Sequence, residues 1–234
     1  PSTEMITLMW SFIVSIYSIG GLLGSSSAGY LSVRFGRKKA MLFANIPALL
    51  GAALMGLSRL CGSFEMIIAG RLFSGVCGGK LAFLPVYAGE ISPKKLRGFI
   101  NVTSTVFLAL GKTVARILGL RELLGSQSRW PMLMASCGFP ALVQLVALPF
   151  FPESPPYLLM HAGDQEGCKK AIRQLWGEGQ HQAEIDDIMK EKATMKNTKI
   201  LSVLELVKEP AFRWQLYMIV ILTATIQLCG INAV

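Results

Sequence analysis

This sequence carries little charge and few of the side chains that enzymes use for chemistry. Of its 234 residues, 16% are Asp, Glu, Lys or Arg, against roughly 25% in soluble domains. Neither of its two histidines, His161 and His181, stands in a zinc-binding pattern. Its five cysteines show no paired metal spacing, and no nucleophile elbow, phosphate loop or dinucleotide fingerprint is present. We therefore predict that it is not an enzyme and has no catalytic residue, metal or cofactor.

Long apolar runs take the place of these missing features. Hydrophobic residues make up 52% of the chain and are gathered in blocks. Six blocks have about the 17 to 25 residues that a membrane-spanning helix needs: Met5–Leu31, Ala40–Leu57, Met66–Ala88, Phe99–Leu120, Pro131–Phe151 and Trp214–Val234. We predict an all-α, polytopic membrane helical bundle in a lipid bilayer. Asn45 and Pro47 make the second span the weakest.

The basic residues predict the orientation of the spans. Of the 23 Lys and Arg residues, 16 lie in the first, third and fifth loops and three in the second and fourth. Because cytoplasmic loops carry the excess of Lys and Arg, we expect the first, third and fifth loops in the cytoplasm. The formal net charge of +9 then reflects topology and contact with anionic lipid, and we predict no nucleic-acid partner.

Four cations lie inside the apolar blocks: Arg71, Lys80, Lys112 and Arg116. Each would cost about 2.5 to 3.5 kcal/mol at the centre of a membrane helix. Lys112 and Arg116 are four residues apart and share one helix face, which predicts that both turn toward a wet cavity or an anion. The alternatives are that Arg71 extends to the nearer headgroups and that the Lys112 and Arg116 pair reflects sequence drift.

Small residues recur every four positions in two predicted spans, which favours close helix packing. Pro85, Pro140 and the Gly78-Gly79 pair add points at which a helix can bend. The two small faces are Gly20, Gly24 and Ala28 in the first span and Gly70, Ser74 and Gly78 in the third.

The composition predicts three domains: a transmembrane bundle of five spans over residues 1–151, a cytoplasmic helical linker over 152–213, and the first span of a second half over 214–234. In the linker, Gly163-Asp164 offers a start for a helix ending near Trp176. His181–Lys196 has the acidic front and basic end that suit a helix dipole, and Leu201–Val207 suits a short amphipathic helix. The alternative for this domain is a flexible linker.

A short hinge between the third and fourth spans, Gly89–Gly98, holds one carboxylate, Glu90, and three cations. Glu90 ends one span and Arg97 starts the next. Placing these two charges at a membrane boundary costs free energy. We therefore predict that a moving bundle uses them.

Several short motifs along the whole chain point to one family. They are Arg34-Phe35-Gly36-Arg37-Lys38, Gly70-Arg71-Leu72, Pro85-Val86-Tyr87, Gly89-Glu90-Ile91-Ser92-Pro93, Leu96-Arg97-Gly98, Pro152-Glu153-Ser154-Pro155 and Gln227-Leu228-Cys229-Gly230-Ile231-Asn232-Ala233. With them the chain resembles the facilitative hexose transporters, sugar porters of the major facilitator superfamily. Four segments resemble the fructose and urate branch more than the glucose branch: Ser63-Phe64-Glu65-Met66, Gly119-Leu120-Arg121-Glu122-Leu123-Leu124, Arg213-Trp214-Gln215 and Gln227-Leu228-Cys229-Gly230. The resemblance implies the major facilitator fold, with this chain as helices two to seven of twelve.

The resemblance also implies roles for single residues. The cytoplasmic charge network that latches the two halves would comprise Arg37, Glu90, Arg97 and Glu153. On the seventh helix, Gln227 and Asn232 would bind sugar hydroxyls, because amides both donate and accept hydrogen bonds; the alternative is polar contact between helices. Arg116 and Ile226 stand where the family usually has glutamine. The other departures from the family pattern are Val33, Lys80, Lys112 and Pro156.

We thus expect a multi-pass plasma-membrane carrier. It would transport a hexose, either fructose or glucose, as a uniporter by alternating access. Two alternatives stay open. Lys112 and Arg116 on one face favour an anionic substrate such as urate, and the altered residues favour a truncated, non-transporting paralogue.

Overall fold

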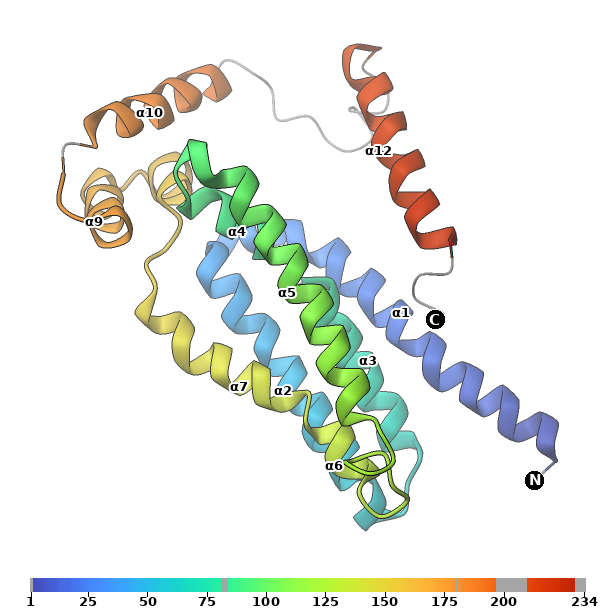
Figure 1. Cartoon of the computed structure of the whole chain (residues 1–234). Helices are drawn as coiled ribbons and strands as arrows, with labels where there is room; N and C mark the ends of the chain where they lie inside the picture. The colour runs from blue at the N-terminus through green and yellow to red at the C-terminus, as the bar shows by residue number, and fades with distance from the viewer. Residues whose placement is uncertain (1, 81–83, 180, 197–209, 230–234) are drawn as a thin grey trace. The chain divides into compact units, whose positions relative to one another are not determined.

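The computed structural model describes residues 2–80, 84–179, 181–196 and 210–229. All regular structure in these ranges is helical, as predicted (Figure 1). The chain forms two compact units, Pro1–Ile185 and Asp186–Val234. The predicted three-domain division stays a prediction.

Among the described residues, five segments of the first unit are long and apolar enough to cross a membrane, and they match the first five predicted blocks. α1 (Thr3–Phe35) and α2 (Arg37–Cys61) are continuous. The third segment comprises α3 (Glu65–Lys80) and α4 (Leu84–Ile91), and the fourth comprises the 3-10 turn η2 (Lys94–Leu96) and α5 (Arg97–Leu118). The fifth comprises α6 (Trp130–Ala135), α7 (Gly138–Ala147) and the 3-10 turn η3 (Leu148–Phe150).

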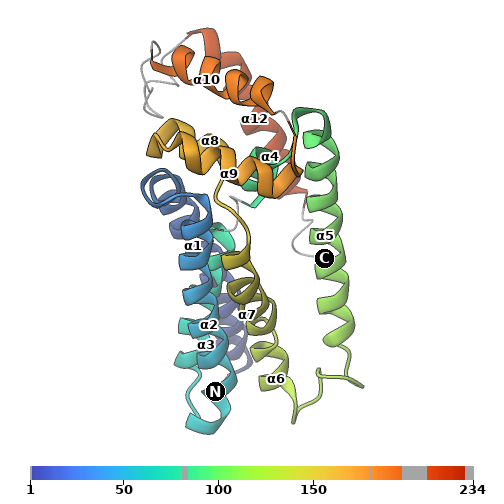
Figure 2. The same ribbon diagram turned by 90° about the vertical axis from the view of Figure 1, so that its left-hand side faces the viewer.

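The loops gather at two opposite ends of the bundle (Figure 2). At one end, the Tyr87 hydroxyl donates to the Pro152 carbonyl at 2.7 Å and the Lys38 ammonium donates to the Pro149 carbonyl at 2.8 Å. At the other end, the Arg59 guanidinium donates to the Ser128 carbonyl at 2.6 Å. The odd-numbered loops thus lie together and the even-numbered loops lie together, as five alternating crossings require.

α1 and α3 make the most extensive helix contact of the unit. Gly20 and Gly24 of α1 are buried, and a Cβ atom added at either would overlap a carbonyl of α3, from Leu72 or Val76. The predicted small face of α1 is therefore confirmed, because two backbones meet where a side chain would keep them apart.

The predicted small face of α3 is confirmed in part, but toward α2, because Gly70 and Ser74 lie close to the α2 backbone at Gly51. Gly75 and Gly79 approach the α1 carbonyls, whereas Gly70 packs against α2 at Gly51. A helix with small residues at several spacings has more than one such face, and its neighbours decide which one each helix uses.

α2 contacts α3 and also α6 and α7. α2 is the most buried of the five spans, with 39% of the residues in its most apolar stretch buried, although it was predicted to be the weakest span. Pro47 lies inside it without interrupting the helix. Neighbouring helices bury the small side chains of α2, which include Ala40, Ala44, Ala48 and Ala52.

The fifth span is interrupted between α6 and α7, close to Pro140 as predicted. Proline has no N–H group to bond the carbonyl four residues back, here that of Ser136. Helix α6 ends at this point: Ser136 is its C-cap, and the Ser136 N–H donates to the carbonyls of Met132 and Leu133.

Beyond the fifth span the chain forms short helices: α8 (Pro155–Tyr157), the π-turn η4 (Leu158–Ala162) and α9 (Gln165–Trp176). Asp164 caps α9 by accepting from the Gly167 N–H at 2.8 Å, so the predicted helix start is confirmed. α9 buries Cys168, Ala171 and Ile172 on one face, which argues against a flexible linker here.

Two further helices complete the described chain. α10 (Gln182–Lys196) confirms the predicted second linker helix, whereas the predicted Leu201–Val207 piece lies outside the described residues. α12 (Pro210–Leu228) starts four residues before the sixth predicted block, and its apolar part, Phe212–Ile226, is shorter than the five spans.

Candidate functional site

A charge cluster joins the helix ends on one side of the first unit. Arg37, the first residue of α2, donates from Nε and Nη2 to the carboxylate of Glu90 in the last turn of α4, at 3.1 to 3.3 Å. The planar guanidinium fork suits both oxygens of a carboxylate. The two side chains are only 16% and 19% exposed, so removal of either one would leave a poorly solvated charge.

Ser154 and Tyr157 extend this cluster. Ser154 is fully buried; its hydroxyl donates to Glu90 Oε2 and, as the N-cap of α8, accepts from the N–H of Tyr157, the last residue of that helix. The Tyr157 ring lies 5.5 Å from the Arg37 guanidinium carbon, within range of a cation–π contact. The Pro-Glu-Ser-Pro motif thus reaches a carboxylate 64 residues earlier in the chain.

Glu153 acts as a cap for α2. Its Oε1 accepts from the Lys38 N–H at 2.9 Å and from the Ser154 N–H at 3.1 Å. The first N–H groups of a helix lack partners within it and carry partial positive charge, so a carboxylate stabilises this end. Gly36 makes room, because its φ is +95° and a Cβ there would come within 2.6 Å of Glu153 Oε2.

The structure brings together three of the four residues predicted to form the charge network: Arg37, Glu90 and Glu153. Arg97 is exposed at the first residue of α5, and its side chain makes no hydrogen bond or ion pair within the part of the chain that is described. Its role stays a prediction. Ser154 was not predicted, although it lies in the Pro-Glu-Ser-Pro motif, because only the fold shows that its hydroxyl reaches Glu90.

Pro156, a departure from the family pattern, fits its place without strain. It is the second residue of α8, whose cap is Ser154. The first N–H groups of a helix have no carbonyl partner in that helix, so a proline there removes no hydrogen bond.

Two of the three residues predicted to bind substrate, Gln227 and Arg116, lie on described helices of different units. Gln227 is in the last turn of α12, whereas Asn232 lies outside the described residues. Arg116 is exposed in the last turn of α5. It shares one helix face, at spacings of three and four, with Asn101, Thr105, Leu108 and Lys112, all of them exposed.

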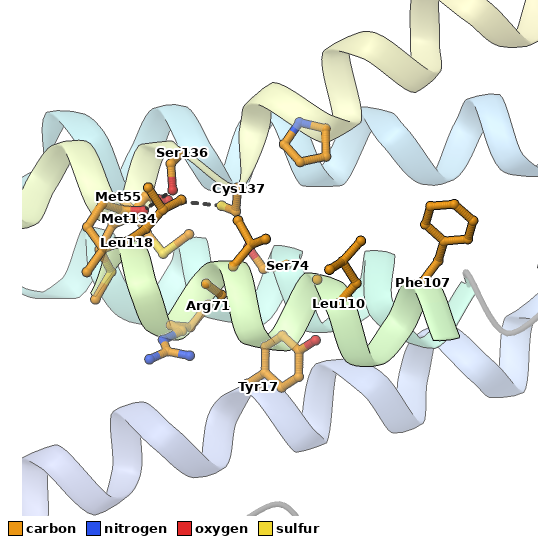
Figure 3. A pocket seen from close by; sticks show the side chains of 15 residues that line it. Tyr17, Met55, Arg71, Ser74, Phe107, Leu110, Leu118, Met134, Ser136 and Cys137 are labelled. Carbon is orange, nitrogen blue, oxygen red and sulfur yellow. Dashed lines mark hydrogen bonds between the residues drawn. The ribbon is translucent and has the colours of Figure 1, made fainter. Parts of the chain in front are cut away.

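An apolar cavity of about 680 Å³ lies on the other side of α5, between that helix and α1, α2, α3 and α6 (Figure 3). Neither Lys112 nor Arg116 lines it, but Arg71 does. Arg71 Nε and the hydroxyl of Ser74, which also lines the cavity, are buried and have no hydrogen-bond partner within the described ranges. The cavity wall therefore holds unused hydrogen-bonding capacity.

The described residues contain no group of three His, Cys, Asp or Glu side chains that could hold a metal ion. The charge cluster offers ion pairing, hydrogen bonding and helix capping at a point where several helices end.

Comparison with known proteins decides the family. The family model described as "Sugar (and other) transporter" matches residues 2–234. The chain belongs to this family. Among curated relatives of this sugar transporter chain are the human solute carrier family 2, facilitated glucose transporter member 11, 44% identical over 99% of this chain and 47% of the relative, and the sheep (Ovis aries) member 5, 45% identical over 98% and 46%.

Solved structures show the same fold for this sugar transporter chain. The xylose transporter XylE from E. coli, in a partially occluded inward-open conformation, superposes with a TM-score of 0.69 at 22% identity, over 76% of this chain and 46% of that one. XylE described as a major facilitator superfamily proton:xylose symporter bound to 6-bromo-6-deoxy-D-glucose gives a TM-score of 0.68 at 22% identity, over 85% and 46%. The predicted major facilitator fold is therefore confirmed, and the chain is that of a multi-pass membrane protein. It spans about half the length of these relatives.

Proposed function

We propose that the protein carrying this chain is a facilitative transporter of hexose, fructose or glucose, in the plasma membrane. The observation that carries the proposal is 44% to 45% identity along nearly the whole chain to relatives named as facilitated glucose transporters. The site residues support it, because they suit binding and gating.

In this proposal Gln227 and Asn232 bind sugar hydroxyls. An amide offers both a donor and an acceptor, as a hydroxyl requires, and carries no charge to desolvate. Arg116 contributes from the polar face that it shares with Asn101 and Thr105. A guanidinium donates to neutral oxygens as well as to anions, so Arg116 can bind a sugar hydroxyl.

The charge cluster serves as the gate. Arg37, Glu90 and Glu153 hold the cytoplasmic ends of the spans, while exposed Arg97 is free to meet the second half of the transporter. In alternating access the two halves rock about a site near the middle of the membrane, and interface ion pairs repack between the states. Such a carrier needs no ATP.

Uptake of labelled fructose, glucose and urate by the full-length protein in cells tests this proposal. We expect hexose uptake that saturates, and at least a tenfold loss in Gln227→Ala and Asn232→Ala with surface expression unchanged. If the wild-type protein takes up urate but no hexose, and Arg116→Gln abolishes the urate uptake, the substrate is an anion and not a hexose. No uptake of any of the three by surface-expressed protein would contradict transport.

A further inference from the structure

A second pocket lies far from the membrane cavity, on the cytoplasmic segment of the first unit. Its volume is about 450 Å³, and the residues that line it are Lys169, Ile172, Arg173, Gly179, His181, Gln182 and Ile185. We propose that this pocket binds the phosphate group of an organic phosphate ester. The proposal is independent of sugar transport.

Two uncompensated cations carry this inference. Lys169 and Arg173 are exposed one turn apart on α9, and neither side chain makes a hydrogen bond or ion pair with a described residue. The acidic residues near in sequence do not line the pocket; they are Glu166, Glu178, Glu184 and Asp186. A guanidinium beside an ammonium suits a phosphate, whose oxygens accept several charge-assisted hydrogen bonds.

The pocket offers more than charge. Ile172 and Ile185, 1% and 9% exposed, form an apolar floor on which the organic part of an ester can rest. α10 begins at Gln182, and the N-terminal end of a helix carries partial positive charge. The volume falls within the range of ordinary small-molecule sites.

The wall of the pocket is held in place by contacts on its far side. His181 donates from Nε2 to the Gly177 carbonyl at 3.2 Å, and its ring meets the Trp176 ring edge-on at a centroid distance of 5.6 Å. Trp176 in turn donates to the Ile91 carbonyl at 3.0 Å, next to Glu90. A ligand in the pocket would therefore stabilise α9 where it docks at the charge cluster.

Binding to the purified full-length protein in phosphatidylcholine nanodiscs tests the site. One arm titrates ATP as a soluble ester, and the other titrates dioctanoyl phosphatidylinositol 4,5-bisphosphate as a lipid headgroup. We expect saturable binding in at least one arm, and that arm names the source of the phosphate. Lys169→Gln with Arg173→Gln should weaken the Kd at least tenfold.

Lys170→Gln is the matched control, because it removes the same charge from the same helix outside the pocket. It should change the Kd less than twofold. The proposal is overturned if neither ligand saturates, if the double variant binds like wild type, or if the control loses as much as the double variant. Should the double variant fail to fold, Arg173→Gln alone should weaken the Kd at least threefold, and an unchanged Kd would count against the site.

Discussion

At the scale of single residues, two carboxylates in one cluster do different work. Glu90 pairs with the Arg37 guanidinium and also accepts from Ser154. Glu153 accepts from backbone N–H groups at the start of α2. The first is a charge pair and the second is a helix cap, so their replacement should have distinguishable effects.

Replacing Glu90 by glutamine should lower the free energy of unfolding by about 1 to 3 kcal/mol, because Arg37 keeps its charge in a poorly solvated place without a countercharge. Thermal unfolding in detergent measures the change. Glu122→Gln removes an exposed carboxylate and should change stability by less than about 0.5 kcal/mol. Equal effects of the two variants would contradict the pairing.

Replacing Glu153 by glutamine should have a smaller effect, about 0.5 to 2 kcal/mol, because a neutral amide oxygen can still accept but the charge at the helix end is lost. Hydrogen exchange should rise in the first turn of α2 and stay unchanged at the end of α4. Faster exchange at the end of α4 alone would rule out the capping role.

Cys168 should resist modification. It is fully buried, and burial, with a smaller contribution from the Asp164 carboxylate, raises the pKa of its thiol. N-ethylmaleimide at neutral pH should label exposed Cys61 and spare Cys168 until the protein unfolds, as mass spectrometry would report. The unfolded chain loses the Cys168 proton at a lower pH than the folded protein does. The contribution of the protonated thiol to the free energy of unfolding is therefore complete below the unfolded-state pKa and is lost as pH rises through the folded-state pKa.

At the scale of helices, close backbone approach holds α1 and α3 together. Gly24→Ala places a methyl group against the Val76 carbonyl, which should cost more than about 2 kcal/mol. Gly29, on the same helix, has open space around its Cβ position, so Gly29→Ala should be neutral or stabilising by up to about 1 kcal/mol. Thermal unfolding that ranks the two variants in the opposite order would refute the packing.

The helices themselves were largely predictable from the sequence, because hydropathy over about 20 residues reports burial in lipid directly. Less predictable was which face each helix presents. α3 has small residues on several faces, and only its neighbours select Gly75 and Gly79 for α1. The charge cluster was predictable in part: the family motifs pointed to Arg37, Glu90 and Glu153, whereas the contact of Ser154 with Glu90 depends on the fold.

At the scale of the whole molecule, this chain holds one set of packed spans and a charge cluster that joins the helix ends on one side of them. The face of α5 with Lys112 and Arg116 is exposed, and no residue of α5 is buried. A bundle with such a polar face is suited to line a transport pathway shared with further helices.

The central claim is facilitated hexose transport, and uptake by the full-length protein in proteoliposomes tests it most directly. Without ATP or any ion gradient, labelled fructose or glucose should enter until its internal and external concentrations are equal, and unlabelled hexose loaded inside should accelerate entry. Glu90→Gln should slow both processes, while Glu122→Gln should leave them unchanged. The account would be contradicted if labelled hexose entered empty and protein-containing liposomes at the same rate. It would also be contradicted if entry required an imposed proton gradient.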